Sequence, residues 1–90
     1  MYDILYTKQF KKDLKLCQKQ NLNLSKIKKV IDLLATGKPL PSKYHDHNLS
    51  GNYSGFRECH IAPDWLLIYL IDNSRLILTL TRTGSHSQLF

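Results

Sequence analysis

Four histidines in a chain of 90 residues are the side chains with the widest chemical scope. An imidazole both accepts and donates a proton near neutral pH, so grouped histidines can act as general acids and bases. His47 lies in a long polar connection, and His60 and His86 lie at the ends of strand-like runs. Asp64 follows His60 by four residues, and Arg82 precedes His86 by four residues. Because loops at strand ends converge on one rim of a sheet, we expect these side chains to form one site.

Together these residue types suit one reaction, the cleavage of RNA by attack of a ribose 2′-hydroxyl on the adjacent phosphate. That reaction needs a base for the hydroxyl, an acid for the leaving 5′-oxygen and a cation for the charge that develops on phosphorus. Histidine and aspartate can transfer the protons, and Arg82 offers a planar fork of donors to phosphate oxygens. Trp65 and Phe90 can stack on unpaired bases, although Trp65 suits the core equally well. The chemistry requires no metal ion.

Metal binding and thiol catalysis are the alternative uses of these residues. His45 and His47, and the adjacent Cys59 and His60, are side chains of the kinds that bind metals. Neighbouring residues on a strand point to opposite faces, so Cys59 and His60 are poorly placed to bind one ion. Cys59 also lies beside Ile61 in an apolar, alternating run, where a cysteine usually acts as a small hydrophobic residue. We therefore expect no metal site and no cofactor.

The first half of the chain has the pattern of one strand and two helices. Alternation over residues 2–6 predicts a short first strand. Thr7 is a suitable N-cap for a helix whose apolar side chains recur at helical spacing, namely Phe10, Leu14 and Cys17. A second helix is expected from about Ser25 to the glycine cap at Gly37, with its apolar face formed by Leu24, Ile27, Val30, Ile31 and Leu34.

The second half predicts a long surface connection over residues 38–55 and then three strands, 56–61, 65–71 and 75–82, joined by hairpin turns. Alternation through Leu78 and Leu80 would place Arg82 on the apolar face unless a bulge or the strand's end turned it. A short tail follows to Phe90. This element order predicts an α+β fold, with two N-terminal helices packed on a mainly antiparallel four-stranded sheet.

Length and composition restrict the classes of protein. Ninety residues with 42% hydrophobic and 22% charged residues suit a single soluble domain spanning 1–90. Two cysteines without a CxxC motif provide no disulfide framework, which favours a reducing compartment. The longest apolar run, residues 65–71, is too short to span a membrane, and the N-terminus does not have the pattern of a signal sequence. We expect a cytoplasmic protein with no membrane partner.

The charge is concentrated in the first half of the chain. The net charge is +6, yet residues 1–45 carry ten Lys and three Asp, whereas residues 46–90 carry three Arg and four acidic residues. Such a basic surface suits the phosphates of a nucleic acid, although a row of lysines on a helix is more often only its solvated face.

The second half of the chain resembles the YafQ-like branch of the RelE/ParE superfamily, the toxins of bacterial toxin-antitoxin modules. The resemblance rests on Asp46-His47 with Leu49 and Gly51, on residues 55–61, on Pro63-Asp64-Trp65 with Leu67-Ile68-Tyr69, and on residues 82–86 with Leu89-Phe90. The first half agrees in element order and in Phe10-Lys11-Lys12-Asp13. RelE itself uses a Lys, Arg and Tyr set, so the histidines favour the YafQ branch.

This resemblance implies a RelE-like fold and a ribosome-dependent endoribonuclease that cuts translated mRNA and is held inactive by a cognate antitoxin in a toxin-antitoxin hetero-oligomer. The family's proton-transfer positions fall on His47, His60, Asp64 and His86, its transition-state arginine on Arg82, and its substrate-contacting aromatic residues on Trp65 and Phe90. We expect His86 to protonate the leaving oxygen, with His60 and Asp64 on the 2′-hydroxyl side and His47 assisting. His45 and Tyr53 have no role in this assignment.

Two alternatives remain. A ParE-like toxin that binds a protein target such as gyrase needs the fold and a basic surface but none of the His, Asp and Arg set. A small nucleic-acid-binding regulator would bind RNA tightly and leave it uncut. The filled catalytic positions favour the nuclease over both.

Overall fold

The computed structural model describes all residues from Met1 to Phe90. The chain forms β1 (Asp3–Tyr6), α1 (Lys8–Lys19), α2 (Leu24–Ala35), the 3-10 turn η1 (Ser42–Tyr44), β2 (His47–Asn48), the 3-10 turn η2 (Gly51–Tyr53), β3 (Arg57–Ala62), β4 (Trp65–Asp72), β5 (Ile77–Gly84) and α3 (His86–Leu89). No helix has the length and apolar character needed to cross a membrane.

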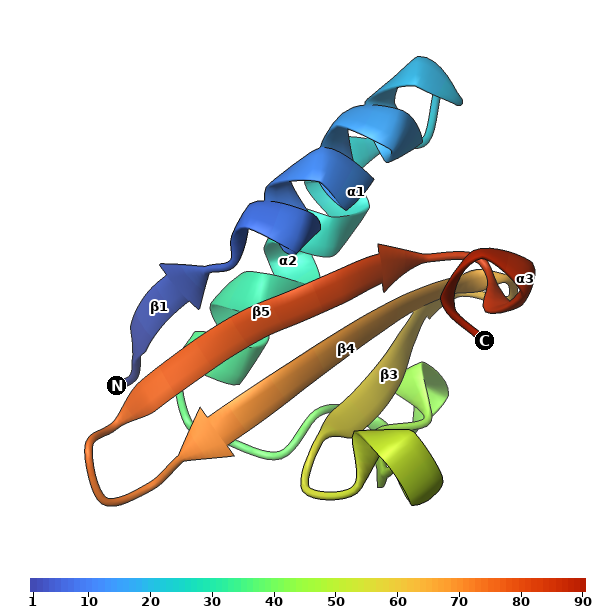
Figure 1. Ribbon diagram of the computed structural model, residues 1–90. Coiled ribbons are helices and arrows are strands. Elements are labelled where there is room, and N and C mark those ends of the chain that lie inside the picture. The colour runs from blue at the N-terminus through green and yellow to red at the C-terminus, as the bar shows by residue number, and fades with distance from the viewer.

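One sheet with the strand order β1-β5-β4-β3-β2 organises the molecule. β1 pairs with β5 in parallel, and the other neighbouring strands are antiparallel. α1 and α2 cover one face of this sheet, whereas α3 and η2 lie toward the other (Figure 1). The expected α+β class and mainly antiparallel sheet are confirmed.

The expected number of strands was wrong, because the sheet has five strands rather than four. The additional strand, β2, has only two residues and pairs with Arg57 and Glu58 of β3. Arg57 also holds this segment through its side chain, since its guanidinium donates to the Asp46 carboxylate at 2.9 Å and to Asn48 Oδ1 at 2.5 Å. Because β2 is held by contacts with residues distant in the sequence, its own two residues carry no hydrophobic pattern from which the strand could be predicted.

The two long helices begin at side-chain caps. Thr7 Oγ1 accepts a hydrogen bond from the Phe10 backbone N–H at 3.0 Å, which confirms the expected N-cap of α1. Asn23 Oδ1 accepts from Ser25 N at 3.0 Å and starts α2, one turn after α1 has ended. Gly37 follows α2 with a φ of +81°, a left-handed conformation that glycine adopts without strain.

The main core lies between the two helices and the sheet, and includes Phe10, Cys17, Val30, Tyr69, Leu78 and Leu80, each at most 1% exposed. Burying one large apolar side chain stabilises a fold by about 1.5–3 kcal/mol. A smaller cluster on the opposite face joins Leu66 and Ile68 of β4 to Leu89 of α3. β4 is therefore buried on both faces, which explains its nearly continuous apolar sequence.

The last strand ends later than expected, and the tail is not irregular. β5 continues to Gly84, and residues 86–89 form α3, which begins with a capping box. Ser85 Oγ accepts from Gln88 N at 3.3 Å, and Gln88 Oε1 accepts from Ser85 N at 2.8 Å. This helix fixes the position of His86 relative to the sheet.

A bulge in β5 turns Arg82 away from the apolar face. Ile68 pairs with Arg82, but the next residue, Tyr69, pairs with Leu80, so Thr81 is an extra residue in β5. The side chains of Leu78 and Leu80 remain in the main core, and Arg82 lies across from Ile68, whose side chain packs in the smaller cluster. The sequence allowed either a bulge or a strand end to re-aim this arginine, and the structure has the bulge.

Candidate active site

Three imidazoles lie in a row on the open face of the sheet. His47 comes from β2, His60 from β3 and His86 from the start of α3, and their side chains are 48%, 23% and 58% exposed. The ring centroids of His47 and His60 are 6.3 Å apart, and those of His60 and His86 are 6.0 Å apart. The predicted histidines therefore meet, although 39 positions separate the first from the last.

Glu58 is a member of this cluster that the sequence interpretation missed. Its carboxylate is buried, with Oε1 at 3.4 Å from His47 Nε2 and 3.6 Å from His60 Nε2. The β2–β3 register places His47 directly across from Glu58, and His60 follows Glu58 by two residues on the same face of β3. The negative charge of this buried carboxylate therefore lies between the two imidazoles.

Asp64 pairs with His86 rather than with His60. It lies in the turn between β3 and β4, where Oδ1 accepts from the His86 backbone N–H at 3.1 Å and is 3.5 Å from His86 Nδ1. This contact orients the imidazole through Nδ1 and leaves Nε2 without a protein partner. Nε2 is therefore the atom of His86 that can exchange a proton with a substrate.

His47 is oriented by the backbone of His45. Its Nδ1 lies 2.7 Å from the His45 carbonyl oxygen, and because that oxygen only accepts, Nδ1 carries the hydrogen. His45 has a left-handed φ of +49°, and its ring centroid is 5.6 Å from that of His60. His45 thus belongs to the cluster, although the sequence interpretation gave it no role.

Arg82 is bound by Asp13 of α1, a second residue that the sequence interpretation did not include in the site. Arg82 Nε donates to Asp13 Oδ2 at 2.8 Å and Nη2 donates to Oδ1 at 3.2 Å. The hydrogen bond that Arg82 donates to Asp13 is the main reason that the pKa of Arg82 is raised above its usual value, so the guanidinium remains charged. Asp13 is 7% exposed and also accepts from Thr83 N at 3.2 Å.

The two aromatic residues expected to contact substrate occupy different surroundings. Trp65 is 3% exposed, packs in the main core and donates from Nε1 to Thr83 Oγ1 at 2.9 Å. Its ring supports the sheet beneath the site and offers almost no surface to a base. Phe90 is 59% exposed, and its ring centroid is 6.0 Å from that of His86. Tyr53, which had no expected role, lies edge-on to Phe90 at 5.5 Å.

Cys59 is part of the core. It is fully buried, and burial raises the pKa of its thiol to about 12, so the nucleophilic thiolate is not formed near neutral pH. No group of three or more His, Cys, Asp or Glu side chains has an arrangement that could hold a metal ion. The side chains that the cluster offers are imidazoles, carboxylates and one guanidinium.

Comparison with known proteins identifies the family. The family described as "Bacterial toxin of type II toxin-antitoxin system, YafQ" matches residues 2–90. The chain belongs to the YafQ family. The resemblance inferred from the sequence is confirmed, and the ParE-like alternative is not favoured.

Several YafQ-like proteins show how closely the family match extends to sequence and fold. The mRNA interferase toxin YafQ of Escherichia coli strain K12 is 43% identical over 89 residues, which cover 98% of this chain and 95% of that protein. A metal-bound toxin from Helicobacter pylori has a TM-score of 0.93 at 48% identity and full coverage of both chains. The toxin in an E. coli DinJ-YafQ complex has a TM-score of 0.91 at 42% identity, covering 100% of this chain and 99% of that chain.

Proposed function

We propose that this YafQ-family protein is the toxin of a type II toxin-antitoxin system and an endoribonuclease that cleaves mRNA on translating ribosomes. The observation that carries the proposal is the row of three histidines, each held by a protein contact, with the exposed ring of Phe90 beside His86. Tyr53, which packs against Phe90, also contacts the charged Arg82. Membership of a family whose E. coli relative is named an mRNA interferase supports the same activity. Because its substrate is mRNA in translation, the protein acts in the cytoplasm.

The mechanism is attack of the ribose 2′-hydroxyl on the adjacent phosphate. A base removes the hydroxyl proton, the 2′-oxygen bonds to phosphorus, and the bond to the 5′-oxygen breaks as an acid protonates that oxygen. The products are a 2′,3′-cyclic phosphate upstream and a 5′-hydroxyl downstream. Arg82 stabilises the charge that develops on the phosphate oxygens.

The contacts in the site divide the roles among the residues. His86, oriented by Asp64, is the acid for the leaving 5′-oxygen because its Nε2 is free. His60 is the base, and the negative charge of Glu58 stabilises the positive charge that His60 gains with the proton. His47 assists from the other side of Glu58. This assignment moves Asp64 from the 2′-hydroxyl side, where it was expected, to the acid side. Phe90 stacks on a base next to the cut.

The decisive experiment incubates the purified toxin with ribosomes carrying a defined mRNA and analyses the ends of the fragments. We expect a cyclic phosphate upstream and a 5′-hydroxyl downstream. A 5′-phosphate on the downstream fragment would refute 2′-hydroxyl attack, and uncut mRNA would refute the nuclease. Inhibition of gyrase without mRNA cleavage would instead support the ParE-like alternative.

The partner proposed for the free toxin is a small antitoxin, as in the E. coli DinJ-YafQ complex. Residues 1–45 carry ten lysines. The partner that matches this positive charge is an acidic, disordered antitoxin segment that folds on binding. Co-expression of the gene adjacent to the toxin gene should restore growth, and the affinity of the complex should fall as salt rises. A neighbour that neither binds nor restores growth would contradict the pairing.

A further inference from the structure

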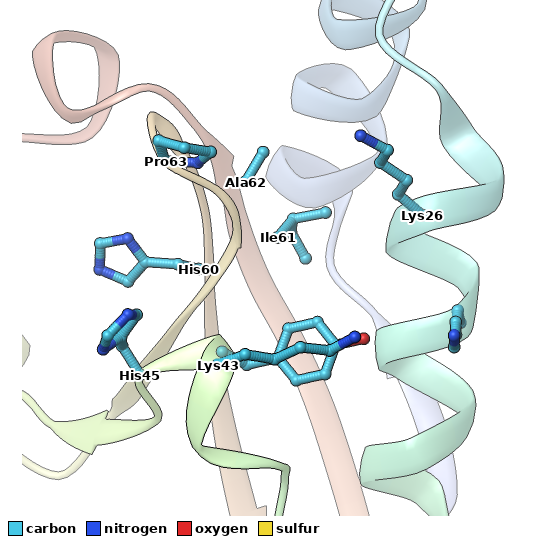
Figure 2. Close-up of a pocket in the computed structure, with 9 residues that line it drawn as sticks. Lys26, Lys43, His45, His60, Ile61, Ala62 and Pro63 are labelled. Carbon is cyan, nitrogen blue, oxygen red and sulfur yellow. The ribbon is translucent and has the colours of Figure 1, made fainter.

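A groove of about 700 Å³ adjoins the row of histidines, between α2 and the chain from η1 to the end of β3. We call it the lysine groove, and its wall includes Lys26, Lys29, Lys43, His45, His60 and Ile61. Figure 2 shows the imidazoles of His45 and His60 on one side of this space and the Lys26 side chain extending from α2 on the other. This volume lies in the range of clefts that bind small ligands and is large enough for a nucleotide.

The charge of the groove has one sign. No Asp or Glu lines it, and none of its three lysines pairs with a carboxylate elsewhere in the structure. Lys28, on the same helix but outside the groove, is by contrast paired with Asp32 at 2.8 Å. The three ammonium groups of the groove are thus free to bind an anion.

We propose that the lysine groove binds phosphates of the mRNA strand next to the cut. This inference rests on the proposed nuclease function. A strand whose scissile phosphate lies at His60 must continue away from it on both sides, and Phe90 with His86 accounts for one side only. His60 itself forms part of the groove, so the groove provides the path on the other side. Lysine ammonium groups bind backbone phosphates without reading sequence.

The test compares two triple variants with the same loss of charge. Lys26→Gln/Lys29→Gln/Lys43→Gln removes the lysines of the groove, whereas Lys8→Gln/Lys19→Gln/Lys38→Gln removes three exposed lysines outside it. The measured quantity is the toxin concentration that half-saturates cleavage of ribosome-bound mRNA over a series of salt concentrations. We expect the groove variant to lower the slope of log affinity against log salt by about 2 relative to the control variant, because each single-strand phosphate contact contributes about 0.7.

A second arm asks whether the groove contacts mRNA itself. Neutral methylphosphonates replace the phosphates, one at a time, at the positions flanking the cut of the mRNA. At one position we expect the methylphosphonate to weaken binding of the wild-type toxin to the mRNA. The same replacement should not weaken the binding of the groove variant any further. Equal salt slopes for the two triple variants, or equal sensitivity to every methylphosphonate, would overturn the proposal. A groove variant that cuts normally but no longer binds antitoxin would assign the groove to the protein partner. Failure of the wild type to cut would refute the proposed function instead.

A different observation concerns two partly buried ion pairs of arginine, Arg82–Asp13 and Arg57–Asp46. Asp13 contacts Arg82 through Nε and Nη2, which form the side edge of the guanidinium, and the Tyr53 hydroxyl is a second, weaker partner of the same group. No carboxylate occupies the end edge, formed by Nη1 and the second hydrogen of Nη2, so this edge can hold two phosphate oxygens. Arg57 contacts Asp46 in the same way but also donates from Nη1 to Asn48, so both of its edges are occupied.

We infer that Asp13 is a positioning residue, which aims the end edge of Arg82 at the reacting phosphate. This second inference also rests on the proposed function. Asp13 is itself held by Gln9 Nε2 at 3.0 Å and by Thr83 N, so the guanidinium is attached to two elements, α1 and β5. Misplacing a catalytic group by about 1 Å can slow a reaction on the order of 10²-fold.

Asp13→Asn keeps an acceptor for Thr83 N but removes the charge that aligns Arg82. We expect single-turnover cleavage to slow by about 10- to 100-fold with ribosome affinity unchanged, and Asp13→Asn to add no further loss in an Arg82→Ala background. Normal cleavage by Asp13→Asn would overturn the inference. An equal loss of rate in the wild-type and Arg82→Ala backgrounds would also overturn it, because it would mean that Asp13 acts on the fold. If Asp13→Asn does not fold, the same cycle with Asp13→Glu, which keeps the charge but shifts the carboxylate, gives the answer. If the wild-type toxin leaves the mRNA uncut, that result would refute the proposed nuclease function and not the role of Asp13.

Discussion

At the scale of single residues, the site consists of pairs, each joining a proton-transferring or phosphate-binding group to one that orients it. His86 has Asp64, His60 and His47 share Glu58, and Arg82 has Asp13. A catalytic side chain that is already oriented loses little entropy as the reaction proceeds. The orienting partners are therefore expected to affect rate more than binding.

Replacing His86 by alanine should separate catalysis from binding. An acid for the leaving oxygen acts in the transition state, so His86→Ala should slow single-turnover cleavage by about 10²- to 10⁴-fold with little change in ribosome affinity. His86 is more than half exposed, so the thermal midpoint should stay near that of the wild type. A variant that cuts at the normal rate would contradict the assigned role.

The Glu58→Gln substitution keeps the size of the side chain and removes its charge. Because the carboxylate is buried between His47 and His60, the amide no longer places a negative charge beside either ring. We expect cleavage to fall by at least about 10-fold, measured in single turnover with the cut site unchanged. Asp72→Asn, which removes an exposed carboxylate remote from the histidines, is the control. Equal rates for both variants would show that Glu58 has no catalytic role.

At the scale of elements, short segments complete the site that the long ones support. β2 carries His47, the bulge at Thr81 turns Arg82, and α3 carries His86 and stands beside Phe90. None of these segments has a strong intrinsic preference for its structure. Each is held by a cap or by contacts with a neighbouring strand, so the precision of the site depends on them.

The cap of α3 gives a prediction at this scale. Ser85→Ala removes the side-chain acceptor for Gln88 N and should destabilise this short helix by about 1 kcal/mol. The loosened helix would misplace His86, so cleavage should fall several-fold while the sheet, seen in hydrogen exchange of β4 and β5, stays protected. Ser87→Ala removes a hydroxyl that lies 3.2 Å from Ser85 Oγ but accepts from no backbone N–H, so it should have little effect. Equal cleavage rates for the two variants would contradict the prediction, because they would show that the cap of α3 does not affect catalysis.

At the scale of the whole molecule, the sheet divides the work between its two faces. α1 and α2 cover one face of the sheet (Figure 1), and the main core lies beneath them. The other face carries the histidines and the smaller apolar cluster. Glu58 and Cys59 are neighbours on β3, yet one faces the site and the other is core. Stability and activity can therefore be changed separately at adjacent positions.

The buried thiol of Cys59 predicts how stability depends on pH. Its pKa rises from the ordinary value of 9.0 to about 12 in the folded protein, and burial also raises the pKa values of Cys17 and Tyr69. The unfolded chain therefore releases these protons at lower pH than the folded chain does. The stabilisation is complete below pH 9 and is lost progressively as pH rises toward 12.

Urea unfolding measured between pH 8 and pH 11 checks this dependence. The free energy of unfolding should fall across that interval, and it should fall less steeply for Cys59→Ala, even though that variant is less stable throughout because it leaves a small cavity. The same slope in both proteins would mean that Cys59 does not contribute to the alkaline loss of stability.

Local sequence determined much of this molecule. The two helices, their caps at Thr7 and Asn23, and the three long strands follow from apolar spacing and capping, which act over a few residues. The family, and with it the set of His, Asp and Arg positions, is also evident from short motifs in the second half of the chain. The charge distribution indicates an anionic partner without any knowledge of the fold.

Tertiary structure alone decided which of those residues act together. Asp13 meets Arg82 across 69 positions and Asp64 meets His86 across 22, and both contacts depend on where a bulge and a short helix place the ends of β5. The burial of Trp65 and the pairing of β2 depend equally on strand register. A shift of one residue in a strand exchanges its two faces, so no local pattern can specify such contacts.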